Sequence, residues 1–282
     1  MIKNLYRFLN PGYQKVYLEQ RVNLVPRYGH GNPPHGRLYD IVSSGRHVYR
    51  KSIQRIIEHK AELWNIRDSG AETNKDEPSW NNGFLPGLDI MSLYSIISDY
   101  KPSRYIEIGS GNSTKVANRA KRDNCQGLEI ISVDPSPRAE IGDVTDKIFR
   151  ENLENTNLNI PEMLNEGDIL FIDGSHRMHP NSDTMVFFME ILPRLRKGVI
   201  VQLHDIYIPY DYPQFMCDRF YSEQYCLAIW LLANPERSEI ILPNYFISQD
   251  DELSGLLSPV WDNKNLNNVE RHGGSFWFRI AG

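Results

Sequence analysis

The stretch Tyr105-Ile-Glu-Ile-Gly-Ser-Gly-Asn-Ser-Thr114 decides the fold of this 282-residue chain. Its apolar start predicts a short buried strand over residues 104–108, and a helix is predicted over residues 114–122. Between them, Gly109 and Gly111 allow a tight turn and a close approach of the backbone to a ligand. A strand, a glycine turn and a helix form the opening unit of a doubly wound α/β fold. Thr114 stands at the third glycine position of the dinucleotide pattern GxGxxG, which disfavours a nicotinamide cofactor.

The same alternation of strands and helices continues along the chain. Short apolar runs predict strands, and longer periodic runs predict helices: strands over residues 129–133, 168–172, 198–203, 239–242 and 275–280, and helices over 89–100, 180–195 and 214–233. Strands that are apolar on both faces imply a parallel sheet covered by helices on both sides. We therefore predict a doubly wound α/β domain over residues 89–282.

The first 88 residues show a different pattern. Helical spacing is loose over residues 1–25 and clearer over residues 38–67, whereas residues 26–37 and 68–88 contain the glycine and proline of loops. Residues 1–88 are therefore predicted to form a mostly helical N-terminal extension. Its loops are candidates for a lid or a substrate-binding segment, since loops of this length are often functional.

Composition narrows the class of protein. The formal net charge is −5, from 31 basic and 36 acidic residues, so the chain lacks the basic surface that nucleic-acid binding needs. Three cysteines without metal-binding spacing argue against a disulfide framework and favour a reducing compartment. No apolar run approaches the ~18 residues of a membrane span. We expect a cytoplasmic protein without membrane insertion that acts on a small molecule.

Acids and histidines follow four of the predicted strands, where ligands of such sheets bind. They are Glu107 with the loop from Gly109 to Ser113, then Asp134, then Asp173 to His176, and finally His204 with Asp205. An acid at the first position suits a cationic group of a ligand. Asp134, 23 residues after Gly111, is placed to accept the hydroxyls of a ribose, although it could also cap a helix. The pattern predicts one shared site at this edge of the sheet.

Together these residues resemble the cofactor site of class I S-adenosylmethionine-dependent methyltransferases. Two further runs narrow the resemblance to the type called methyltransferase domain 24: Gly167-Asp-Ile-Leu-Phe-Ile-Asp-Gly-Ser-His176 and His204-Asp-Ile-Tyr-Ile-Pro-Tyr-Asp-Tyr-Pro213. Additional matches are Pro26–Gly29, Asn82–Asp89, Ser222–Tyr225 and Gly274–Arg279. Relatives of this type include macrolide-sugar O-methyltransferases and cephalosporin-hydroxylase-like proteins.

The resemblance implies a Rossmann-like seven-stranded sheet of order 3-2-1-4-5-7-6, with strand 7 antiparallel. It also implies roles for the site residues. Glu107 would hold the methionine part of the cofactor together with the loop residues Gly109, Ser110, Gly111, Asn112 and Ser113. Asp134 would bind the ribose, and Asp173 would face the transferred methyl group. His176 would be the catalytic base.

Transfer of a methyl group to a hydroxyl needs a base or a metal, because the hydroxyl must lose its proton. His176 suits the first role, since histidine titrates near pH ~6.5. Metal-dependent relatives place acids where Asp173, His204 and Asp205 stand here, but histidine suits Zn, Mn or Fe better than Mg²⁺. Alternatively, Asp205 caps a loop and His204 is a neutral contact to the substrate.

We therefore expect an S-adenosylmethionine-dependent methyltransferase that modifies a hydroxyl of a small-molecule or carbohydrate-like acceptor, with or without a divalent metal. The acceptor, the methylated atom and a homo-oligomeric state are left open. One alternative is a metal-dependent hydroxylase or oxidoreductase built on Asp173, His204 and Asp205. Another is a non-catalytic binding module with the same fold. Glu223 is expected at the surface because it lies in a helix whose apolar positions form the core, although its place in the matching run Ser222–Tyr225 keeps it a candidate for the site.

Overall fold

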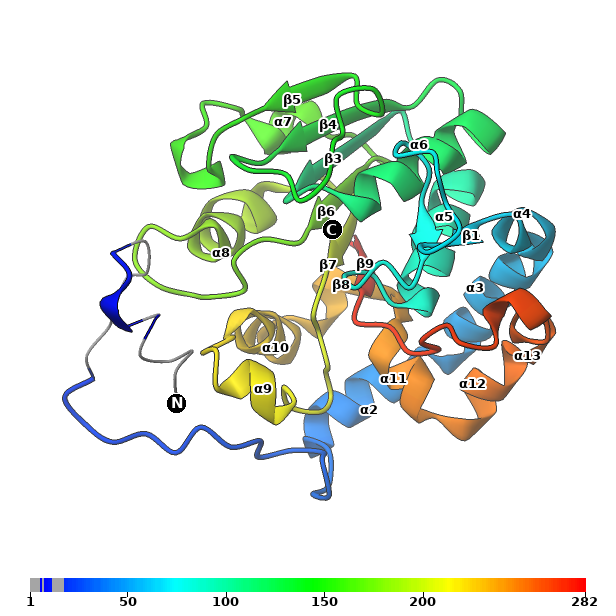
Figure 1. Ribbon diagram of the computed structural model, residues 1–282. Helices are drawn as coiled ribbons and strands as arrows, with labels where there is room; N and C mark the ends of the chain where they lie inside the picture. Colours follow the sequence, from blue (N-terminus) through cyan, green and yellow to red (C-terminus); the bar gives the residue numbers. More distant parts are fainter. Residues whose placement is uncertain (1–5, 7, 12–17) are drawn as a thin grey trace.

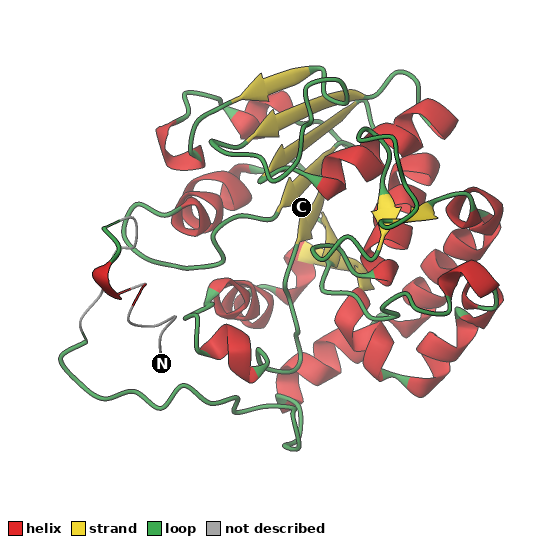
Figure 2. Cartoon of the chain, viewed as in Figure 1, coloured by secondary structure: helices red, strands yellow, loops and turns green. Residues whose placement is uncertain are grey.

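The computed structural model describes residues 6, 8–11 and 18–282, and its centre is a seven-stranded sheet (Figures 1 and 2). In spatial order the strands are β5 (Lys147–Phe149), β4 (Glu129–Val133), β3 (Arg104–Ile108), β6 (Ile169–Ile172), β7 (Ile200–Leu203), β9 (Phe276–Ile280) and β8 (Ser238–Pro243). β9 runs antiparallel to both of its neighbours, and the other pairs are parallel. The predicted strand order and the antiparallel seventh strand are confirmed.

Helices cover both faces of the sheet. In Figure 1, α5 and α6 lie on one side, and α8 and α10 lie on the other. The α-helices are α2 (Gly36–Ser44), α3 (Arg46–Glu58), α4 (Lys60–Trp64), α5 (Gly87–Tyr100), α6 (Asn112–Asn124), α7 (Ile160–Met163), α8 (Asp183–Val186), α9 (Gln214–Cys217), α10 (Glu223–Ala233), α11 (Asn244–Gln249), α12 (Asp251–Leu256) and α13 (Ser258–Trp261). No helix in the described ranges is long and apolar enough to cross a membrane.

The core lies between the sheet and its helices. All four residues of β6 and of β7 are buried, because each strand has a strand on either side and helices above and below. A strand enclosed in this way must be apolar on both faces, and this is why its sequence does not alternate. The sequence therefore predicts the inner strands to within a residue or two.

Several boundaries differ from the prediction. The predicted helix over residues 38–67 is three helices, since Gly45 ends α2, and a side chain there would collide with the Tyr49 ring. The predicted helix over 214–233 is likewise divided into α9 and α10. β5 was not located by its pattern, because an edge strand of three residues, none of them fully buried, leaves no apolar run. A π-helical turn at Phe187–Ile191 continues α8.

The helices before residue 88 share the core of the sheet. α3 packs against β8, α5 and α12, and buried residues of α2, α3 and α4 belong to the same apolar cluster as the strands. The 26–37 loop docks far from the ends of β3 and β4, where Arg27 N donates to Asp211 Oδ2 (2.9 Å) and Asp211 N donates to Tyr28 O (3.0 Å). Of the helical pattern expected over residues 1–25, residues 6, 8 and 9 are helical, whereas residues 18–25 form bends and irregular chain; residues 1–5, 7 and 12–17 lie outside the described residues. The domain division at residue 88 stays a prediction.

A two-stranded parallel sheet, β1 (Arg67–Asp68) with β2 (Ser79–Trp80), completes the N-terminal part. It leads into the loop before α5, and this loop carries Phe84. Since Arg138 of the loop after β4 lies over the Phe84 ring, the loop before α5 reaches the site described next.

Candidate functional site

A cavity of about 350 Å³ opens at the carboxyl ends of β3, β4 and β6. Its wall includes Gly109 and Ser110 after β3, Asp134 after β4 and Asp173 after β6. The volume lies in the range of about 300–1,000 Å³ that is usual for small-molecule sites. Four of the residues that sequence analysis selected therefore surround one space.

Gly109 allows two strand ends to approach each other. Its φ is +80°, and a Cβ atom there would lie 2.0 Å from the backbone oxygen of Asp173. Gly109 N donates to Val133 O (3.1 Å), and Asp173 N donates to Ile108 O (2.8 Å). Only glycine fits at this position between β4 and β6, since both the backbone conformation and the lack of space exclude a Cβ atom.

Asp134 ties together the turns that follow β3 and β4. Its carboxylate accepts hydrogen bonds from Ser110 N (2.7 Å) and Ser136 N (2.7 Å). The residues that follow it, 135–146, form turns and bends, so Asp134 does not cap a helix. Since each carboxylate oxygen has more than one lone pair, Asp134 retains acceptor capacity toward the cavity that it lines.

Glu107 does not reach the cavity, contrary to its expected contact with a cationic ligand group. It is fully buried and accepts hydrogen bonds from Ser132 Oγ (2.6 Å), Ser113 Oγ (3.1 Å), Tyr105 Oη (3.2 Å) and Thr114 Oγ1. Burial raises the pKa of Glu107 to about 7, although these hydroxyls favour the charged form. Its carboxyl group thus joins β3, β4 and the start of α6 by hydrogen bonds behind the glycine turn.

Thr114 explains how the turn works without a third glycine. Its hydroxyl accepts a hydrogen bond from Gly111 N (3.0 Å) and donates to Glu107, so it fixes the start of α6. Gly111, Asn112 and Ser113 lie outside the set of described residues that line the cavity. Of the predicted loop, Gly109 and Ser110 alone belong to that wall.

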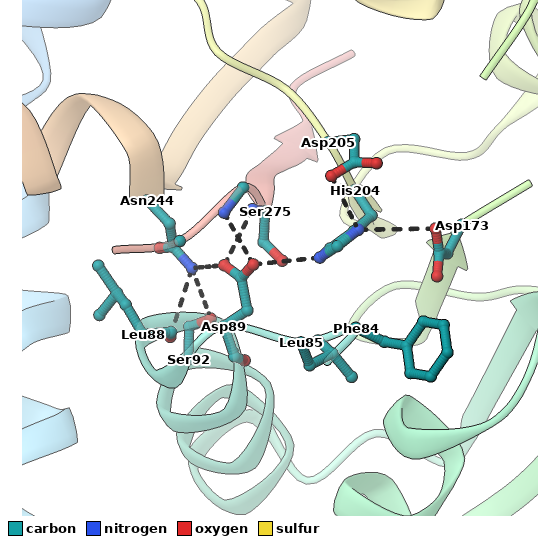
Figure 3. A network of polar contacts seen from close by, with 12 residues as sticks. Phe84, Leu85, Leu88, Asp89, Ser92, Asp173, His204, Asp205, Asn244 and Ser275 are labelled. Carbon is teal, nitrogen blue, oxygen red and sulfur yellow. Dashed lines mark hydrogen bonds and ion pairs between the residues drawn. The ribbon is translucent and has the colours of Figure 1, made fainter. Parts of the chain in front are cut away.

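His204 links the cavity wall to a buried acid. Its Nδ1 lies 3.6 Å from Asp173 Oδ1 and 3.6 Å from Asp205 Oδ1, and its Nε2 lies 3.1 Å from Asp89 Oδ2 (Figure 3). Asp89, at the start of α5, has no exposed surface and also accepts from Gly274 N (2.7 Å), Ser275 N (2.9 Å) and Asn244 Nδ2 (2.7 Å). This network joins α5, β7 and β9, and sequence analysis missed Asp89.

His176 makes a second connection of the same kind. Its Nε2 lies 3.2 Å from Asp173 Oδ1 and 3.5 Å from Asp205 Oδ2, and its Nδ1 lies 3.0 Å from Glu223 Oε2. Its ring stacks on Tyr221, with the centroids 4.7 Å apart. Glu223 is buried, so its predicted surface position is wrong. Two histidines, each backed by a buried acid, thus hold Asp173 and Asp205 between them.

The charges of this cluster follow from its geometry. Burial by itself would lower the pKa values of His176 and His204, but the carboxylates around them outweigh it and raise both well above 6.5. The two imidazoles in turn hold the pKa of Asp173 well below its usual range, against the effect of burial. Each ring nitrogen of the two histidines faces a carboxylate, and this arrangement favours the protonated imidazole.

The three predicted metal ligands, Asp173, His204 and Asp205, lie close together. Among the described parts of the chain, no group of three or more His, Cys, Asp or Glu side chains could hold a metal ion. His204 Nε2 lies 3.1 Å from Asp89 Oδ2, and its Nδ1 lies 3.6 Å from both Asp173 Oδ1 and Asp205 Oδ1. The metal prediction and the metal-dependent hydroxylase alternative stay predictions.

Comparison with known proteins agrees with the sequence resemblance. Residues 106–206 match the model of a family described as a methyltransferase domain. The matched segment covers 101 of the 282 residues. It contains Gly109, Asp134, Asp173, His176 and His204, so the matched region includes most of the site. The search of curated proteins finds no match.

Solved structures of methyltransferases are similar to the chain at low identity. One from Podospora anserina, with S-adenosylhomocysteine bound, is 16% identical over 90% of this chain and 100% of its own, with a TM-score of 0.44. A plantazolicin methyltransferase in complex with a substrate analogue and S-adenosylhomocysteine is 11% identical over 86% of this chain and 100% of its own (TM-score 0.45). An O-methyltransferase from Bacillus cereus is 12% identical over 82% and 91% (TM-score 0.37).

Proposed function

We propose that this chain transfers a methyl group from S-adenosylmethionine to a hydroxyl of a small-molecule or carbohydrate-like acceptor. The observation that supports this most is the cavity itself, which collects Gly109, Asp134 and Asp173 around one space on a sheet of the predicted order. A ribose can donate its hydroxyls to Asp134 on one side. A sulfonium, which is a cation, is favoured next to Asp173 on the other. The methyltransferase domain match covers all three residues.

The cofactor would supply an electrophilic methyl group, and the chain would supply the binding surface and the proton acceptor. In this assignment Asp134 and Ser110 hold the adenosine part, and Asp173 faces the reacting end. The cofactor's thioether would be the leaving group and would keep the electron pair of the bond to the methyl carbon. The acceptor oxygen is then left with a proton that must depart.

Asp173 is the best placed proton acceptor, because it lines the cavity and its carboxylate is held ionised by His176 and His204. A carboxylate with a low pKa suffices, since the acceptor oxygen becomes strongly acidic as its new bond forms. His176 is then a positioning residue: it is buried behind Asp173 and orients it. In this proposal Asp173 takes the base role that the resemblance implied for His176.

The test is calorimetric titration of the folded protein with S-adenosylmethionine and S-adenosylhomocysteine. We expect micromolar binding that Asp134→Ala weakens tenfold or more, which corresponds to ~1.4 kcal/mol. Asp143→Ala is the matched control, because Asp143 is exposed and lies outside the cavity wall. Failure of the folded wild type to bind either compound would overturn the proposal and return the non-catalytic module to consideration.

A further inference from the structure

Arg138 and Asp173 form an open pair of opposite charges in the cavity. Arg138 belongs to the loop after β4, and its Nη1 lies 3.9 Å from Asp173 Oδ2 after β6. A direct hydrogen bond between such groups spans about 2.7–3.2 Å, so the two charges face each other without closing on one another. Both residues line the cavity.

The position of Arg138 is set from two sides. Its backbone N donates to Ser110 O (3.3 Å), which fastens its loop to the turn after β3. Its guanidinium lies over the ring of Phe84, 5.2 Å from the centroid, in a cation–π arrangement. The loop before α5 carries the Phe84 ring toward the Asp173 end of the network and away from Asp89 (Figure 3). The cation is therefore held at the cavity while about half of its side chain stays exposed.

Arg138 supplies the positive charge of the cavity wall. Among the described residues that line the cavity, Arg138 is the sole arginine or lysine. The wall also carries three other acids: Asp134, which faces the ribose in the proposed function, Glu154, and Asp183, which accepts from Ser175 N (2.6 Å). Arg138 and Asp173, 3.9 Å apart, present opposite charges side by side to a ligand that carries one anionic group and one cationic group.

We propose that Arg138 and Asp173 receive the α-amino acid end of the cofactor, with its ammonium at Asp173 and its carboxylate at Arg138. This inference rests on the proposed function and names a residue for the anion of the ligand. The planar guanidinium presents two parallel N–H groups to a carboxylate, which a lysine could not do. Glu107, the residue that sequence analysis chose for the cationic group, has no surface on the cavity.

The experiment compares two ligands that differ in this end only. S-Adenosylhomocysteine carries the amino acid, whereas 5′-methylthioadenosine has the same nucleoside and a thioether but lacks it. For Arg138→Gln, calorimetry should show a loss of tenfold or more in affinity for S-adenosylhomocysteine and a change below threefold for 5′-methylthioadenosine. The affinity of Arg138→Lys for S-adenosylhomocysteine should lie between those of the wild type and Arg138→Gln, since lysine keeps the positive charge but lacks the two parallel N–H groups of the guanidinium.

Arg194→Gln is the matched control. Arg194 is exposed to a similar degree, lies 3.9 Å from the Glu162 carboxylate and is outside the cavity wall, so its loss should leave both affinities unchanged. Equal weakening of both ligands by Arg138→Gln would mean that the loop had been disturbed, and no weakening of either would mean that the carboxylate binds elsewhere. Either result overturns the inference while the proposed function stands. Absence of binding by the wild type would overturn the proposed function itself.

Discussion

Replacing Glu107 with glutamine removes a carboxyl group that the fold buries completely. The amide has nearly the same shape, and the four hydroxyls around it can rotate to accept as well as donate hydrogen bonds. The variant should therefore fold. What changes is the ability of this position to carry a negative charge away from water.

The magnitude follows from the pKa of Glu107, which burial raises from 4.5 to about 7, a shift of roughly 2.5 pH units. At 1.36 kcal/mol per unit, this amounts to about 3 kcal/mol. Because the pKa is raised in the folded state, the carboxyl contributes stability that is fully present below pH 4.5 and is lost as the pH rises through 7. Relative to Glu107→Gln, the wild type should thus lose about 3 kcal/mol of unfolding free energy between pH 4.5 and 7.5.

Urea unfolding at pH 4.5, 5.5, 6.5 and 7.5 measures this difference directly. Glu190→Gln is the control for the loss of one acidic side chain, because Glu190 is exposed. A stability difference between Glu107→Gln and the wild type that stays constant with pH would refute the reasoning. A second readout is the affinity for S-adenosylhomocysteine, which should change by less than about threefold. A loss of a hundredfold would instead restore Glu107 as a contact to the cofactor.

Three further substitutions test other parts of the site. Asp89→Asn removes the buried partner of His204 and should cost about 3–5 kcal/mol of unfolding free energy. The loss of unfolding free energy should shrink as the pH falls below 4, because the pKa of Asp89 is lowered in the fold. A loss under 1 kcal/mol at pH 7 would contradict this prediction. Gly109→Ala should lower stability by at least about 2 kcal/mol and abolish cofactor binding, whereas Gly127→Ala, with open space around it, should be tolerated. If both behave alike in thermal unfolding, the steric argument fails. His176→Ala should lower kcat at least a hundredfold and leave the affinity for S-adenosylhomocysteine within threefold; unchanged kcat would remove its positioning role.

Most of the fold could be predicted from the sequence because the patterns that indicate it are local. The inner strands of a parallel sheet are short apolar runs, and glycine with a positive φ marks the turn after β3, so neither depends on distant partners. The residues at the strand ends, Gly109, Asp134 and Asp173, were found for the same reason, since their place along the chain is also their place at the edge of the sheet. β5 and the division of α9 from α10 left weaker local patterns and were missed.

Which of these residues are buried, and against what, was decided by the tertiary structure alone. Glu107 and Asp134 both follow the expected pattern, yet one is enclosed by four hydroxyls and the other lines the cavity. His176 meets Glu223 across 47 residues of chain, and His204 meets Asp89 across 115. The sequence by itself determined which groups gather at the carboxyl edge of the sheet. Only packing decided which of them are exposed to a ligand and in which direction their pKa values shift, because desolvation and ion pairing depend on neighbours in space and not on neighbours in the chain.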